Sequence, residues 1–156
     1  MSAPTFYVTT PIYYVNDKPH IGHAYSTVAA DVLARYARLR GRPTRCLTGT
    51  DEHGQKIEER AKELGEDPAE FVDRMSPPFK EAFEQLNCSF DDYIRTTEPR
   101  HKQIVQQLLQ DLHDKGEIYK AEYVGFYSVR QEQFVQEKDQ VDGNWPEIYG
   151  EVTEIT

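Results

Sequence analysis

Two short segments of this sequence carry side chains that suit chemistry: the tetrapeptide His-Ile-Gly-His at residues 20–23 and the triplet Asp-Glu-His at residues 51–53. The tetrapeptide lies between a short apolar strand pattern and a long helical pattern. A strand-to-helix turn presents free backbone N–H groups and the positive end of a helix dipole, which together bind anions such as phosphate. His20 and His23 therefore have two interpretations from the residues alone: phosphate ligands, or caps and surface groups of the helix.

The elements that must position these residues follow from the flanking sequence. Residues 6–10 are aromatic and β-branched, which favours a strand, and Pro11 ends it by removing an N–H group. After a turn at residues 16–19, apolar residues recur at helical spacing until the Gly-Arg-Pro stop at residues 41–43. The apolar residues of this predicted helix are Val28, Val32, Leu33, Tyr36 and Leu39.

A second strand is predicted over residues 45–50, directly before Asp51. A right-handed crossover would place it parallel to the first strand, with the carboxyl ends of both strands at one crevice. This geometry brings His20, His23, Asp51 and His53 toward a common site. Asp51 also has a simpler interpretation, as the N-cap of the helix that follows.

Helices are predicted over residues 55–64, from Asp67-Pro68 to residue 86, and from Glu98-Pro99 to residue 116, with a short strand at 90–94. We expect Pro77-Pro78 to kink or split the second of these helices. The apolar stripes of the last two helices are interpreted as core. Their members are Phe71, Val72, Met75, Phe79, Phe83 and Leu86, then Ile104, Leu108, Leu109 and Leu112.

After Gly116 the pattern changes to short strands, at residues 118–119 and 123–128, with a turn at Asp142-Gly143 and a strand-like end over 147–156. The last forty residues therefore predict an antiparallel subdomain. The preceding α/β sheet has only two or three strands, which is thin for an independent domain, so we expect the chain to be part of something larger.

Composition excludes several classes of protein. The 156 residues are 38% hydrophobic and 29% charged, as in a soluble domain with a core, and no segment approaches the roughly 18 apolar residues of a membrane span. Without a signal-peptide pattern we expect a cytoplasmic protein that binds no membrane, with Cys46 and Cys88 as reduced thiols.

The net charge of −9 argues against a protein whose whole surface binds nucleic acid. A local basic patch stays open, although the preferred interpretation is a solvated helix end that complements its dipole. The patch comprises Arg35, Arg38, Arg40, Arg42 and Arg45.

Three ordered motifs resemble the N-terminal part of methionyl-tRNA synthetase, a class I aminoacyl-tRNA synthetase. They are TPIYYVN at residues 10–16 leading into HIGH, GTDEHG at 49–54, and RTTE at 95–98 followed by His101. The HIGH tetrapeptide also occurs in related nucleotidyltransferases, so another such enzyme is an alternative that the GTDEHG segment disfavours. The resemblance covers about the first 125 residues.

The resemblance implies a Rossmann-like α/β nucleotide-binding fold. Residues 1–117 would form its first half, with parallel strands and helices, and residues 118–156 the start of an antiparallel connective-peptide subdomain with a knuckle. It also implies ATP-dependent activation of methionine, with Mg²⁺, and attachment of the methionine to tRNA(Met). The alternative is a non-catalytic module that keeps a methionine or nucleotide pocket, or serves interactions, without the chemistry.

The resemblance also implies residue roles. His20, Gly22 and His23 match the ATP-binding positions, and Pro11, Ile12, Tyr14 and Asp51 match the methionine-binding positions. His20, His23 and Asp51 would be the catalytic residues, with Asp51 holding the α-ammonium group of methionine. At least one of Tyr13 and Tyr14 is expected in the core, and Arg95 and His101 are expected to organise the third strand and its helix. No role is assigned to His53.

Two departures from the family pattern carry expectations of their own. Where many relatives place zinc ligands in the knuckle, this sequence has Ser128, Gln131, Trp145 and Ile148, none of which is a zinc donor, so we predict a knuckle without zinc. The Lys-Met-Ser-Lys-Ser signature is also absent from these 156 residues. We therefore expect the chain alone to be catalytically incomplete, either as a fragment or as a free-standing remnant.

Overall fold

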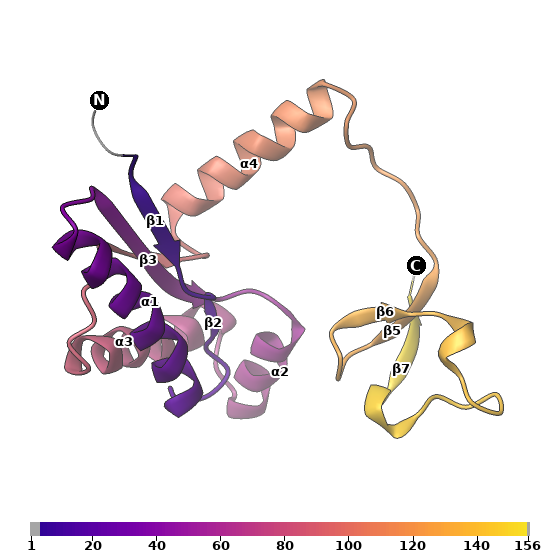
Figure 1. Ribbon diagram of the computed structural model, residues 1–156. Helices are drawn as coiled ribbons and strands as arrows, with labels where there is room; N and C mark the ends of the chain where they lie inside the picture. Colours follow the sequence, from indigo (N-terminus) through magenta and orange to yellow (C-terminus); the bar gives the residue numbers. More distant parts are fainter. Residues whose placement is uncertain (1–3, 156) are drawn as a thin grey trace. The chain divides into compact units, whose positions relative to one another are not determined.

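The computed structural model describes residues 4–155, which form two compact units (Figure 1). One unit ends at Leu108 and the other begins at Leu109. The first unit contains a parallel sheet with helices, and the second contains an antiparallel sheet. The predicted α/β fold followed by an antiparallel region is therefore confirmed.

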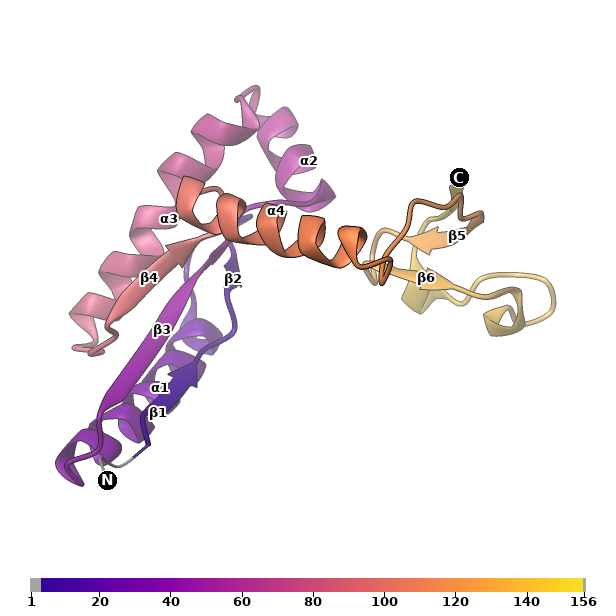
Figure 2. The ribbon, with the colours of Figure 1, turned by 90° about the horizontal axis from the view of Figure 1, so that it is seen from above.

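The parallel sheet is built around one long strand, β3 (Thr44–Asp51), which lies between the other strands in Figure 2. On one side β3 pairs first with β1 (Phe6–Thr9) and then, nearer its end, with the two-residue strand β2 (Tyr13–Tyr14). On the other side it pairs with β4 (Asp92–Arg95). All three pairings are parallel, so the carboxyl ends of the strands share one edge of the sheet.

Four helices connect or follow these strands: α1 (Ile21–Leu39), α2 (Gln55–Leu64), α3 (Pro68–Gln85) and α4 (Pro99–Asp114). The predicted ends of α2 are confirmed, with Gly65 in the left-handed conformation that closes the helix. Pro77-Pro78 does not split α3, because the helix continues through both prolines; a kink at this point stays a prediction.

The core of the first unit forms where α2 and α3 pack on the β2 end of the sheet. Its buried members are Tyr13, Val15, Ile57, Ala61, Phe71, Val72, Phe79 and Phe83. Met75 is partly buried against this cluster, so the predicted apolar stripe of α3 is core except at Leu86, which is 48% exposed. The aromatic residues of α3 thus pack against β2, and His23 lies beside one of these rings.

Helix α1 is confirmed, but its large apolar residues do not face the sheet. Small residues, Ala30, Ala34 and Ala37, are buried where α1 approaches β1 and β3. Five of the large residues form an exposed row that we call the α1 stripe. It consists of Tyr25, Val28, Val32, Tyr36 and Leu39.

The interpretation of the α4 stripe as core is wrong. No residue of α4 is buried, and Ile104 is 71% exposed. The spacing of apolar residues identifies which side of a helix is apolar, but it does not establish that a partner covers that side.

The second unit has a three-stranded antiparallel sheet in which β5 (Gly125–Ser128) lies between β6 (Gln133–Val135) and β7 (Val152–Ile155). Two 3₁₀ turns, Glu137–Asp139 and Glu147–Tyr149, lie between β6 and β7. The predicted turn at Asp142-Gly143 is confirmed, with positive φ at both residues. The predicted strand at residues 118–119 is wrong; Tyr119 is exposed and these residues pair with no strand among those described.

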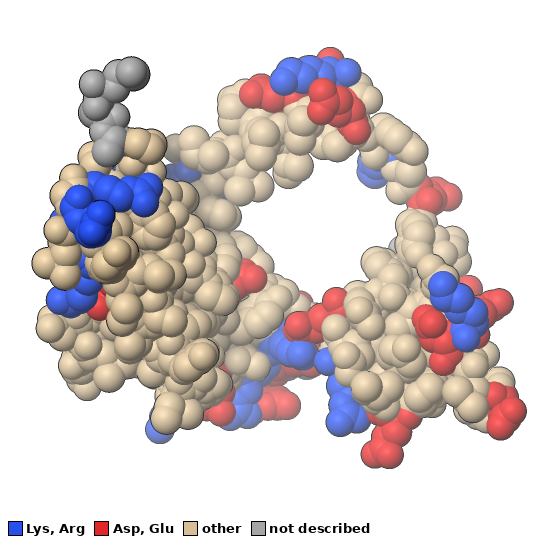
Figure 3. All heavy atoms as spheres, in the orientation of Figure 1, with Lys and Arg blue, Asp and Glu red and all other residues tan. Residues whose placement is uncertain are grey.

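Two arginines at the end of α1 form ion pairs. These pairs favour the interpretation of the basic patch as a helix end over that of a nucleic-acid-binding surface. Arg35 contacts Asp31 at 2.6 Å and Arg38 contacts Asp91 at 2.8 Å. Figure 3 shows Lys and Arg side chains gathered over this end of the helix. Within residues 4–155, no helix combines the length and the apolar character that crossing a membrane requires.

Candidate active site

The two histidines of the HIGH segment form a reciprocal cap at the start of α1. His20 is the N-cap residue, and its Nδ1 accepts a hydrogen bond of 3.0 Å from the backbone N–H of Gly22. The backbone N–H of His20 donates in turn to Nδ1 of His23 at 3.1 Å. The two rings stack with their centroids 3.8 Å apart. The capping interpretation of the histidines is therefore confirmed.

The cap also fixes which nitrogen of each ring carries a proton. Because both Nδ1 atoms accept from backbone N–H groups, a neutral ring must carry its proton on Nε2. Each histidine then keeps an Nε2–H donor that the cap does not use. Capping is therefore compatible with anion binding, since it orients the two donors instead of consuming them.

Gly22 keeps His20 in this position. A Cβ atom at residue 22 would lie 2.8 Å from Cε1 and 3.0 Å from Nδ1 of the His20 ring. Atoms at such distances overlap, so any larger residue would displace the capping ring.

His23 is further held by aromatic rings of the core. Its ring centroid lies 4.9 Å from that of Tyr13 and 5.0 Å from that of Phe79. Burial, and secondarily the neighbouring His20, lower the pKa of His23 below its usual value, so the ring is neutral at neutral pH. Tyr13 itself is 6% exposed, and its hydroxyl contacts Ser26 and Thr27 of α1 at 2.7 and 2.9 Å.

The predicted methionine-binding residues lie on and just before β2. Pro11 and Ile12 are exposed in the connection between β1 and β2. Tyr14 is 42% exposed, whereas Tyr13 is core as expected of one of the two tyrosines. In the parallel pairing Tyr14 lies opposite Asp51, at the end of β3. The two-residue strand β2 therefore links Asp51 to the histidines, because Tyr13 packs on His23.

Asp51 does not cap the helix that follows it, so that simpler interpretation is wrong. The N-cap of α2 is Gly54, which has no side chain to accept a hydrogen bond. The Asp51 carboxylate instead accepts from the hydroxyl of Thr96, at a long 3.5 Å. His53 lies at the same strand end, with Nε2 at 3.3 Å from the carbonyl oxygen of Thr96. It also borders a cavity of about 670 Å³ at the start of α2.

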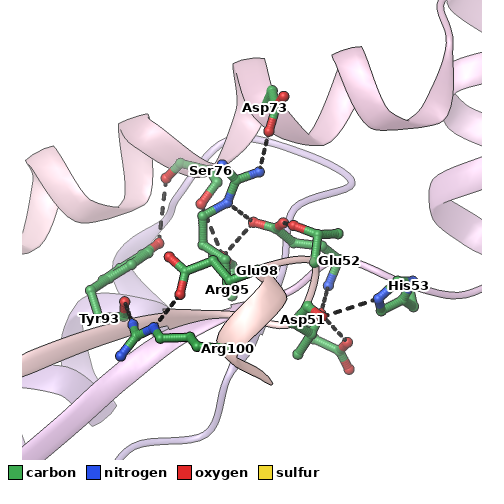
Figure 4. Close-up of polar contacts among 12 residues, drawn as sticks. Asp51, Glu52, His53, Asp73, Ser76, Tyr93, Arg95, Glu98 and Arg100 are labelled. Atoms are coloured by element: carbon green, nitrogen blue, oxygen red, sulfur yellow. Dashed lines mark hydrogen bonds and ion pairs between the residues drawn. The ribbon is translucent and has the colours of Figure 1, made fainter. Parts of the chain in front are cut away.

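Glu52 is a buried charged residue beside Asp51 that sequence reasoning missed. Its side chain is fully buried, and it accepts from Arg95 Nε at 2.7 Å, from Thr50 Oγ1 at 2.7 Å and from the hydroxyl of Thr97. Burial alone would raise the pKa of this carboxyl, but these hydrogen bonds outweigh it and lower the pKa. Arg95 also contacts Asp73 of α3 at 2.6 Å, so it organises β4 as expected (Figure 4).

The positions that match zinc ligands in the family hold a network of hydrogen bonds in the second unit. Ser128 is buried, and its hydroxyl donates to the carbonyl of Tyr149 at 2.6 Å. The side-chain amide of Gln131 donates to the carbonyl of Ile148 at 2.7 Å. The Trp145 ring packs on Phe126, with centroids 5.3 Å apart.

Comparisons with known proteins identify the family of this chain. A curated methionine–tRNA ligase 1 of Bacillus cereus is 53% identical over 138 residues, and a methionine–tRNA ligase of Halalkalibacterium halodurans is 54% identical over the same length. Each alignment covers 88% of this chain and 21% of the relative, so the chain spans about a fifth of these proteins.

Solved structures give the same result. Methionyl-tRNA synthetase of Mycobacterium tuberculosis, in complex with methionyl-adenylate, matches with a TM-score of 0.89 and 42% identity, over 99% of this chain and 31% of that one. The LeuRS of Agrobacterium radiobacter, in a ternary complex with tRNA and LeuAMS, matches with a TM-score of 0.77 and 26% identity. Residues 6–154 match the family described as tRNA synthetases class I (M). This chain therefore belongs to the class I (M) tRNA synthetases.

Proposed function

We propose that this chain supplies one half of the active site at which methionine is activated by ATP. The observation that carries the proposal is the histidine cap, which leaves two Nε2–H donors unused at the positive end of the α1 helix dipole. The similarity to a synthetase solved with methionyl-adenylate supports methionine and ATP as substrates. We also propose that the complete protein attaches methionine to tRNA(Met) and works in the cytoplasm.

In this reaction the carboxylate of methionine attacks the α-phosphate of ATP, and pyrophosphate leaves. Negative charge develops on phosphate oxygens, so donors held in place lower the barrier without a covalent enzyme intermediate. His20 and His23 would donate to these oxygens, with Mg²⁺ accompanying the nucleotide. Asp51 would bind the α-ammonium group, and Pro11, Ile12 and Tyr14 would line the pocket for the thioether side chain.

We assign residues 1–117 to the first half of the catalytic domain and residues 118–156 to the start of the connective-peptide subdomain. We also propose that the knuckle of this subdomain folds without zinc. Serine, glutamine, tryptophan and isoleucine side chains are not zinc donors, and hydrogen bonds from Ser128 and Gln131 occupy the equivalent positions. Stoichiometric zinc in the purified protein would overturn this proposal.

The alternative is a module that binds methionine or nucleotide without catalysis. Methionine-dependent exchange of pyrophosphate into ATP, measured on the complete gene product, separates the two. Exchange that His23→Ala abolishes supports the enzyme, and methionine binding without exchange supports the module. His113→Ala is the matched control, because His113 is a largely exposed histidine far along the chain from the HIGH segment.

A further inference from the structure

Thr96, the residue after β4, connects to four successive residues at the end of β3. Its backbone N–H donates to the carbonyl of Thr50 at 3.2 Å, and its hydroxyl accepts from the backbone N–H of Glu52 at 2.8 Å. The same hydroxyl donates to Oδ1 of Asp51 at 3.5 Å, and its carbonyl lies 3.3 Å from Nε2 of His53. Thr96 is 5% exposed. One threonine thus fixes the backbone of this strand end and contacts the Asp51 carboxylate.

Glu52 holds Thr96 in place from both sides. Its carboxylate accepts from Arg95, which precedes Thr96, and from Thr97, which follows it. Figure 4 shows Arg95 between Glu52 and Asp73, with Asp51 and His53 on the other side of Glu52. A buried carboxylate is costly unless its oxygens are hydrogen-bonded, and three donors meet that requirement here. The Glu52–Arg95 ion pair and the Thr97–Glu52 hydrogen bond therefore hold residues 95–97 against the end of β3.

We propose that Thr96 and Glu52 are positioning residues for methionine binding. Thr96 sets the side-chain conformation of Asp51, and Glu52 acts through Thr96. The contact between Thr96 and Asp51 is long, so it orients the carboxylate and leaves its charge available to an ammonium group. The inference rests on the proposed function, in which Asp51 binds the α-ammonium of methionine.

The test compares KM values in pyrophosphate exchange by the complete gene product. Thr96→Val keeps the shape of the side chain but loses the hydroxyl, and it should raise the KM for methionine about tenfold, as expected for one lost hydrogen bond. The KM for ATP should not change. Thr96→Ser keeps the hydroxyl and should restore most of the methionine affinity. Glu52→Gln should raise the same KM, because it weakens the contacts that hold residues 95–97 without touching substrate.

A merely structural role predicts a different result. Thr96→Val and Glu52→Gln would then lower the melting temperature and reduce the amount of active protein, leaving both KM values unchanged; this outcome would overturn the proposal. If the valine variant does not fold, Thr96→Ala carries the same prediction. Methioninol keeps the ammonium group of methionine and lacks the carboxylate. Its affinity gives a second measurement, and both Thr96→Val and Glu52→Gln should lower that affinity.

Asp51→Asn separates failure of this inference from failure of the proposed function. If Asp51→Asn raises the KM for methionine and Thr96→Val does not, the inference is wrong and the proposed function stands. If neither variant changes that KM, Asp51 does not bind the ammonium group, and the residue roles in the proposed function are wrong as well.

Discussion

Replacing Gly22 by alanine should lower the catalytic activity while leaving the stability of the protein nearly unchanged. Alanine is a better helix residue than glycine by about 0.5–1 kcal/mol. The new Cβ, however, would lie 2.8 Å from the His20 ring and force it out of the cap, and losing a cap costs about 1 kcal/mol. The two effects offset each other, so the free energy of unfolding should change little.

Activity should respond differently, because the displaced His20 ring no longer aims its Nε2–H donor. Loss of one preorganised donor costs roughly 10²–10³ in rate. We expect Gly22→Ala to reduce the kcat of pyrophosphate exchange by such a factor while its thermal unfolding resembles that of the wild type. Ala29→Gly, on an exposed position of the same helix, is the matched control: it should lose about 1 kcal/mol of stability and keep its activity.

A double-mutant cycle tests whether the effect passes through His20. In a His20→Asn background, asparagine is smaller and can still cap the helix, so adding Gly22→Ala should cost little further activity. An equal loss in both backgrounds would refute the reasoning, because it would mean that the methyl group obstructs the nucleotide directly.

Three further outcomes follow from the structure. Burial and the nearby His20 hold the pKa of His23 below its usual 6.5, so the unfolded chain takes up the proton first and stability should fall as the pH drops through 6.5; thermal unfolding of His23→Asn should lack this component. Phe79→Ala in the core should cost about 3–5 kcal/mol in urea unfolding, and an equal loss from the half-exposed Phe134→Ala would contradict the packing described. Ser128→Ala leaves the Tyr149 carbonyl without its side-chain donor and should lower the stability of the second unit by about 1–3 kcal/mol. Amide hydrogen exchange in β5 and β7 should then become faster. Unchanged exchange would mean that this hydrogen bond does not stabilise the knuckle.

Local patterns predicted the elements whose signals lie within a few residues of each other. Helix α2 was predicted at both ends because Gly65 closes it and its apolar residues recur at helical spacing. The stripe of α4 gave an equally clear pattern, yet the helix buries no side chain. Burial depends on what lies across from a helix, and its own sequence does not contain that information.

The candidate site divides in the same way. The histidines and Asp51 could be proposed as site residues because their motifs resemble a known family. Glu52 could not, because its role depends on Arg95, a residue 43 positions away whose partner is unknown until the strands pair. A buried acidic residue directly beside a predicted ligand is nevertheless a signal, since such a charge requires a partner.

The α1 stripe has a consequence for how the chain behaves in solution. Tyr25 and Leu39, at 79% and 86% exposure, are the most exposed members of an apolar row along one helix, which is the kind of surface that associates. The net charge of −9 opposes that association by mutual repulsion, and the repulsion weakens as salt screens it. Colloidal stability should therefore fall with ionic strength, because salt weakens the repulsion that keeps such apolar rows on different molecules apart.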